Sequence, residues 1–318
     1  MPITLAEAQK NVQDALQIGV IDEFRKSSFL LDNLTFDDAV SPTGGGATLT
    51  YAYTRLKTQP TAGTRAINEE YTPGTVEKER HTADLKVFGG SFEIDRVIAN
   101  MGGIISEVTL QTEQKVKAAK ALFNDMFING DSATDAKAFD GLDKALTGSD
   151  TEYNTATAID LSTSALVTTN YMSFLDMLDE FLSGLDGEAS FIGGNSKLMA
   201  KIRACARRAG MYQVTKNDFG QQIERYGNTP LIDFGTKAGS NTNVVAIDGT
   251  AGTTSLYAGR LGLDGLHGVS MAGVSPVNIW LPDFNTAGAV KKGEVEMVAA
   301  MALKASKAAG VFRKIKVQ

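Results

Sequence analysis

The chain has two histidines, and they are the first residues to examine for catalysis or metal binding. His81 lies in a polar stretch, and His267 lies in what reads as a glycine-rich turn. Neither has a Cys, His or carboxylate neighbour at metal-ligand spacing, such as the i, i+4 pair that shares one helix face. A catalytic triad needs a histidine that is oriented by a carboxylate. A small α/β enzyme with a site near His267 is therefore the enzymatic interpretation of this sequence, and it stays open.

The other chemistry-bearing residues offer little more. The glycine runs at 44–46, 89–90, 102–103 and 193–194 read as turns, and none continues into a phosphate-binding loop or a dinucleotide fingerprint. Cys205 is the single cysteine, so it has no disulfide partner within the chain, and we expect it to be a small buried side chain. We expect no catalytic residue, no metal and no cofactor.

A long polar hairpin is the most informative segment. Residues 47–57 alternate in the pattern of a strand, residues 59–74 are polar, and residues 75–92 are again extended. A two-stranded hairpin with so few apolar residues cannot be stable alone, whereas charges of both signs can select a partner and set its register. The candidate intersubunit contacts are Arg55, Lys57, Arg65, Glu69, Glu70, Glu77, Lys78 and Arg80.

The elements around the hairpin suggest a mixed fold. Ser106 can cap a helix that runs to about Ile128 with apolar residues at a 3.6-residue period, which is roughly 33 Å at 1.5 Å per residue. A short helix ends at Leu146. From residue 161, helices at 171–185 and 196–209 alternate with short strand candidates and read as an α/β layer. The strand candidates are 189–192, 222–226, 229–233, 243–248 and 253–261, and extended runs follow at 277–281, 295–307 and 311–317.

Composition excludes several classes of protein. The 318 residues include 31 Lys and Arg against 37 Asp and Glu, with a pI near 5.1 and 43% hydrophobic residues. These values exclude a disordered or disulfide-stapled chain and argue against a general nucleic-acid binder. No apolar run approaches the roughly 20 residues of a membrane span, so we expect no membrane partner. The first 38 residues are acidic and the residues from 288 onward are basic, as in a subunit that contacts other copies.

The order of these parts resembles the major capsid protein of tailed bacteriophages, which has the Hong Kong 97-like fold. The long helix running into Phe127-Ile128-Asn129-Gly130-Asp131, followed by Phe139-Asp140-Gly141-Leu142, resembles that family's spine helix and the turn after it. The resemblance implies an α+β fold in five parts. These are an N-terminal arm (1–36), an extended hairpin loop (37–92), a peripheral domain with the spine helix (93–150), an axial domain (151–275) and strands that return to the peripheral domain (276–318).

The resemblance also implies a function. The chain would assemble through pentamers and hexamers into an icosahedral shell enclosing double-stranded DNA, without sequence-specific binding and without catalysis. It would be found in the virion capsid and assembled in the host cytoplasm. The hairpin would lie over an adjacent subunit, the arm would cross to another, and the loop at 217–226 would lie near the centre of each ring.

Further partners follow from the same resemblance. Many members of the family carry a long N-terminal scaffold that is cut off, whereas this arm begins almost at Met1. We expect no such segment here and no processing of this region, and therefore a separate scaffolding protein, together with a portal and possible decoration proteins. Some members cross-link a loop lysine to a neighbour, which we do not predict for Lys57 or Lys78.

Two more functions stay open beside an enzyme with a site near His267. One is an encapsulin-type compartment shell, which has the same fold but encloses protein cargo. The other is a tail or baseplate protein, which would form rings or tubes. Particle content separates a capsid from a compartment, and particle shape separates both from a tail protein.

Overall fold

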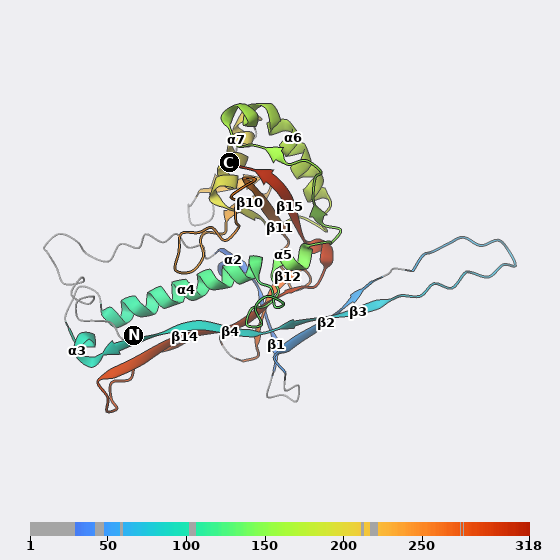
Figure 1. Cartoon of the computed structure of the whole chain (residues 1–318). Helices are drawn as coiled ribbons and strands as arrows, with labels where there is room; N and C mark the ends of the chain where they lie inside the picture. Colours follow the sequence, from blue (N-terminus) through green and yellow to red (C-terminus); the bar gives the residue numbers. More distant parts are fainter. Residues whose placement is uncertain are drawn as a thin grey trace.

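The computed structural model describes residues 29–41, 48–57, 60–101, 106–210, 213–216, 222–273, 275 and 277–318. Residues 1–28 of the expected N-terminal arm, the glycine run at 44–46 and the first half of the expected ring-centre loop (217–221) lie outside these residues. Figure 1 shows an upper α/β unit, a long ribbon of strands with a helix along it, and a thin hairpin that projects away from both.

The ribbon belongs to a five-stranded sheet, in which the long strand β14 (Val290–Leu303) pairs with three of the other strands. On one edge of β14, β4 (Lys86–Asp95) pairs along ten residues. On the other edge, β12 (Leu266–Met271) and β13 (Val277–Trp280) pair with successive parts of the strand. The parallel strand β1 (Phe36–Val40) extends the sheet beyond β12.

The predicted long helix is confirmed as α4 (Glu107–Asn129), with Ser106 at its N-cap. It lies along the ribbon (Figure 1), and Phe123 and Phe127 are fully buried in the shared core. The ring of Phe123 stacks on Phe88 of β4 with centroids 6.1 Å apart. Asn124 does not belong to the apolar period of this helix, yet it is 1% exposed, because the chain packs around more than one face of the helix near its C-terminal end.

The turn after α4 requires its glycines. A Cβ on Gly130 would lie 2.2 Å from the carbonyl oxygen of Phe139, and one on Gly141 would lie 2.6 Å from that of Met126. The Lys144 ammonium closes the same turn, 2.6 Å from Asp131 and 2.9 Å from Asp140. Its hydrogen bond to Asp131 is the main cause that lowers the pKa of this carboxyl to about 2.

The upper unit is built on a second, eight-stranded sheet. Helices α6 (Ser164–Ser183) and α7 (Ser196–Arg208) pack on it and on each other (Figure 1). The side chains predicted to face inward from α7, including Ile202 and Cys205, are buried. The path of the sheet is β5 (Glu152–Tyr153), β15 (Ala309–Lys316), β11 (Thr253–Gly259), β7 (Phe191–Gly194), β10 (Thr229–Asp233), β9 (Gln222–Tyr226) and β8 (Gln213–Lys216), with β6 (Ile159–Asp160) beside β15.

Several sequence predictions differ from this arrangement. Gly193 and Gly194 do not form a turn but lie buried in β7. A glycine is needed at position 193 because the Phe234 ring fills the space that a side chain would occupy. Residues 243–248 are not a strand and make only an isolated bridge at Asn243. Helix α6 begins at Ser164, where Thr163 caps it, rather than at residue 171.

The C-terminal strands divide between the two sheets. Strands β13 and β14 join the ribbon, as expected, but β15 pairs with β11 in the upper sheet. A short 3-10 turn, Ser306–Ala308, separates β14 from β15 and redirects the chain. The expectation that all strands after residue 276 return to the peripheral part therefore differs from the structure at β15.

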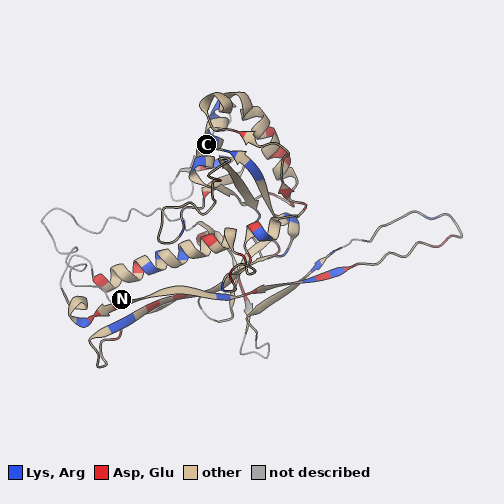
Figure 2. Cartoon of the chain, in the orientation of Figure 1, with Lys and Arg blue, Asp and Glu red and all other residues tan. Residues whose placement is uncertain are grey.

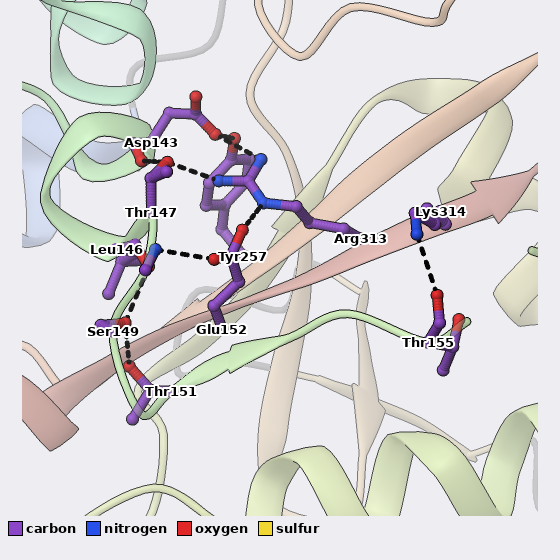
Figure 3. A network of polar contacts seen from close by, with 11 residues as sticks. Asp143, Leu146, Thr147, Ser149, Thr151, Glu152, Thr155, Tyr257, Arg313 and Lys314 are labelled. Carbon is purple, nitrogen blue, oxygen red and sulfur yellow. Dashed lines mark hydrogen bonds and ion pairs between the residues drawn. The ribbon is translucent and has the colours of Figure 1, made fainter. Parts of the chain in front are cut away.

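A polar network ties β15 to the short helix α5 (Leu142–Leu146), as Figure 3 shows. The Arg313 guanidinium donates to Asp143 at 2.8 Å, to Thr147 at 2.9 Å and to Glu152. The Tyr257 hydroxyl also donates to Asp143, at 2.8 Å. Burial is the main cause that raises the pKa of Tyr257, so this phenol stays a neutral donor. The network fixes the upper unit to α5, which packs against α4.

Candidate functional site

The projecting hairpin is formed by β2 (Thr50–Leu56) and β3 (Lys78–Asp84). The two strands pair in continuous antiparallel register from Thr50 opposite Asp84 to Leu56 opposite Lys78. All described residues from 60 to 80 are exposed, and Figure 1 shows this segment extending far from the rest of the chain. The paired hairpin ends at Asp84, because the buried Leu85 turns the chain into β4. Residues 86–92, which were expected to continue the hairpin, lie in the ribbon.

Alternation along β2 gives the hairpin two different faces. Tyr51, Tyr53 and Arg55 lie on the face toward the body, as the sequence pattern predicts, because successive side chains of a strand point to opposite sides. Leu56, Lys78 and other residues of the opposite face are exposed, and the Leu56 side chain is 67% exposed. Figure 2 shows charges of both signs along the hairpin. The outward face and the tip are therefore available to a partner.

The root of the hairpin is fixed to β1 and to the end of β14. The Tyr51 hydroxyl donates to the Asp37 carboxylate at 2.7 Å, and the Lys304 ammonium lies 3.6 Å from the same oxygen. The Tyr53 hydroxyl donates to the Leu303 carbonyl at 2.8 Å. Burial is the main cause that raises the pKa of both phenols, so both remain donors at neutral pH.

Arg55 belongs to this root rather than to the exposed surface. Its Nε donates to the Lys304 carbonyl at 2.8 Å, its Nη2 donates to the Leu303 carbonyl, and its guanidinium carbon lies 5.5 Å from the centroid of the Tyr53 ring. The sequence singled out Arg55 as a partner contact, whereas the structure uses its donors within the chain. The alternation in the sequence already placed Arg55 on the same strand face as Tyr51 and Tyr53, which indicated that it could lie against the body of the protein.

The other predicted contact residues lie on the exposed part of the hairpin. Lys57 and Glu77 face each other across its two strands at 3.8 Å, and both are more than 60% exposed. Arg65 donates to the backbone of the tip, where Glu69 accepts a hydrogen bond from the Ala66 amide. The remaining three are exposed residues of the same segment: Glu70, Lys78 and Arg80.

The histidines lie beside the tyrosines of the root. His267 is not in a turn but in β12, where its side chain is fully buried and its ring meets the Tyr51 ring edge to face. Burial is the main cause that lowers the pKa of His267. His81 stacks on Tyr53, with centroids 5.7 Å apart. The enclosed position of His267 does not fit the accessible loop site that the enzymatic interpretation requires.

The described residues hold neither a metal cluster nor a membrane-spanning helix. No group of three or more His, Cys, Asp or Glu side chains within them is arranged to hold a metal ion. The helices of the described ranges are also too short or too polar to cross a bilayer.

Comparisons with known proteins find no match for the sequence but many matches for the fold. No family model and no curated protein matches the sequence. In contrast, the fold matches a solved encapsulin, SrpI of Synechococcus elongatus, over 100% of this chain and 98% of that one, with a TM-score of 0.66 and 14% identity. It matches the capsid of a native GTA particle over 96% and 95%, with a TM-score of 0.61 and 12% identity. It also matches the capsid of Myoviridae phage XM1 over 95% and 97%, with a TM-score of 0.58 and 12% identity. The chain therefore has the α+β Hong Kong 97-like fold of phage major capsid proteins, as the sequence resemblance implies.

Proposed function

We propose that this chain is the major capsid protein of a tailed bacteriophage, which forms a closed shell by laying its hairpin over adjacent copies. The observation that carries this proposal is the hairpin itself, since every described residue from 60 to 80 is exposed. A two-stranded arm of this length gains little stability in isolation, and a second copy would cover it. The full-length match to shell-forming proteins supports the same conclusion.

The stiff root supports a role in which the hairpin is presented at a fixed angle. Tyr51, Tyr53 and Arg55 attach β2 to two other strands through side-chain hydrogen bonds. A preformed arm loses less conformational entropy on docking than a flexible loop does. The arm therefore suits repeated, identical contacts in a symmetric assembly.

The contents and partners of the shell are part of the proposal. We infer pentamers and hexamers around packaged double-stranded DNA, a separate scaffolding protein, a portal, possible decoration proteins, assembly in the host cytoplasm and no catalysis. The experiment is to produce the chain with and without its neighbouring genes and to image the particles by electron microscopy. Closed shells with nuclease-protected DNA are expected, whereas a uniform monomer under all conditions would contradict the proposal.

A compartment shell is the second candidate. This candidate is supported by the full-length match to an encapsulin, which has a TM-score of 0.66. The two candidates share the shell and differ in what it encloses. Mass spectrometry of washed particles distinguishes them, because a compartment would retain a cargo protein and lack nuclease-protected DNA.

A further inference from the structure

A short segment near the start of the described chain contacts the base of the hairpin (Figure 1). We call residues 29–40 the strap, which begins with α2 (Phe29–Asn33) and ends with β1. Helix α2 is anchored in the core, because Leu30 is only 1% exposed. The Phe29 ring meets Phe191 of β7 edge to face, with centroids 6.4 Å apart. The start of the strap is therefore held by the upper unit.

The other end of the strap, β1, has a weaker attachment. It lies at the edge of the five-stranded sheet, pairs in parallel with β12, and has an irregular register between Asp37 and Val40. Parallel pairing is slightly less stable per residue than antiparallel pairing, and short segments at an edge open at a lower free energy than a core does. Two amides report this pairing directly. The Gly268 amide donates to the Thr35 carbonyl at 3.0 Å, and the Ala272 amide donates to the Val40 carbonyl at 2.8 Å.

The two faces of β1 contact different parts of the molecule, because successive side chains of a strand point to opposite sides. The Phe36 ring faces α4, with its centroid 6.2 Å from that of Phe123. Asp37 faces the hairpin, where its carboxylate accepts a hydrogen bond from the Tyr51 hydroxyl at 2.7 Å and lies 3.6 Å from the Lys304 ammonium. One strand thus packs on the body with one face and holds the hairpin with the other.

The hairpin depends on its root for support. Strands β2 and β3 form a two-stranded sheet of their own, and such a sheet is marginally stable at best without further packing. Tyr53 and Arg55 donate to carbonyls at the end of β14, whereas Tyr51 donates to Asp37 of the strap. Release of β1 would therefore remove the acceptor of the Tyr51 hydroxyl and leave that part of the root without its side-chain hydrogen bond.

We propose that β1 is a latch for the hairpin. The hairpin keeps its fixed direction while β1 is paired with β12, and it loosens when β1 is released. Asp37 is the positioning residue, since it joins the two parts. Linkage makes the effect reciprocal, so a contact that fixes the hairpin strengthens the pairing of β1 by the same factor. The latch is a property of the single chain and does not depend on the proposed shell function.

Hydrogen exchange of the unassembled full chain tests the latch from the side of β1. Phe36→Leu removes the ring contact with Phe123 and leaves the hairpin face of β1 unchanged. Exchange of the Gly268 and Ala272 amides should rise about two- to tenfold, and exchange along β2 should rise with it. The matched control is Phe127→Leu, which removes a contact with the same ring from within α4. It should leave both sets of amides unchanged, because exchange through local opening does not follow global stability. Unchanged exchange in β2 of Phe36→Leu would overturn the proposal.

The same amides test the latch from the side of the hairpin. Tyr51→Phe removes only the hydroxyl that donates to Asp37 and keeps the ring. Exchange of the Gly268 and Ala272 amides should rise about tenfold, because a hydrogen bond to a charged group is lost. Tyr226→Phe is the matched control, since that hydroxyl also donates to a carboxylate at 2.7 Å, but in the upper unit. If Tyr51→Phe leaves both amides unchanged, as the control should, the hairpin and β1 open independently and the latch is wrong.

A double substitution shows whether Asp37 and Tyr51 act through one contact. Asp37→Ala alone should raise exchange along β2, as Tyr51→Phe does. The two substitutions together should raise it little further than either alone, because each removes the same hydrogen bond. Effects that multiply in the double variant would show that the two residues act separately, which contradicts the role given to Asp37.

Discussion

Tyr51 and His267 meet edge to face at the hairpin root, with ring centroids 5.8 Å apart and planes at 79°. Tyr51 belongs to the hairpin and His267 to the five-stranded sheet, so this contact joins the projecting arm to the body. Both ring nitrogens of His267 are buried, and this burial is the main cause that lowers the pKa of the imidazole. The attachment of the arm therefore depends on an imidazole that is enclosed in its neutral form.

Acid should loosen this attachment. Burial and the nearby Lys304 lower the pKa of His267, while Asp37, a backbone hydrogen bond at Gly265 and Asp264 raise it less strongly. The bound arm therefore holds fewer protons at His267 than the released arm does. Its stability is complete above the ordinary histidine pKa of about 6.5 and declines as pH falls below it. Hydrogen exchange of β2 between pH 7.5 and 5 should show the loss of protection.

The matched variants identify the histidine responsible. His267→Phe keeps a ring against Tyr51 and should make the protection of β2 independent of pH in this range. His81→Gln should leave the pH dependence in place, because the His81 ring is partly exposed beside Glu79. Equal pH dependence in the unmodified chain and in His267→Phe would contradict this account.

Arg55 should stabilise the root rather than the partner contact. Arg55→Met removes two side-chain donors to backbone carbonyls and keeps the aliphatic stem. We expect a loss of about 1–3 kcal/mol in the free energy of unfolding, which urea denaturation of the unassembled subunit measures. Lys57→Met, at an exposed pair, should cost less than about 1 kcal/mol. If Arg55→Met is no more costly than Lys57→Met, the root does not depend on this guanidinium.

The Arg313 network should be worth more than any exposed pair. Arg313→Met leaves Asp143 and Glu152 without the guanidinium that bridges them. Because these groups are only partly buried, we expect a loss of about 1–3 kcal/mol rather than the larger cost of a fully buried pair. Calorimetry of the unassembled subunit would measure a lower melting temperature. An unchanged melting temperature would show that the network does not hold the upper unit.

Gly193 should tolerate no side chain. Gly193→Ala would place a Cβ 2.3 Å from the Phe234 ring inside β7, and we expect destabilisation of about 1–3 kcal/mol. Gly249→Ala is the control, because that position has open space and should change stability by less than about 0.5 kcal/mol. Similar urea midpoints for the two variants would contradict the packing described for β7.

Local patterns predicted the elements well, and tertiary pairing explains what they missed. The 3.6-residue period gave α4 and α7, and the alternation at 50–56 gave both faces of β2. The same rules missed β12, since its glycine and histidine read as a turn until pairing with β14 buried them. They also could not assign β15 to the upper sheet, because a strand's sequence does not name its neighbours.

The candidate site was predicted in outline and not in detail. Its alternation and polarity predicted an exposed two-stranded hairpin, which the structure confirms, whereas the role of its charges in binding a partner stays a prediction. The alternation did not show that Arg55 would meet the carbonyls at 303 and 304, which are almost 250 residues away in sequence. The place of Asp37 at the hairpin root was equally hidden, because its contact with Tyr51 depends on the pairing of β1 with β12.

Electron microscopy of the purified chain, combined with nuclease protection, tests the central claim most directly. The account predicts closed shells of uniform size or their five- and six-membered rings, with protected double-stranded DNA when the chain is produced with its neighbouring genes. Removing residues 60–77 and joining the strands by a short turn should leave a folded subunit that does not form shells. A chain that stays monomeric in every condition, or shells that form equally well without the hairpin, would contradict the claim.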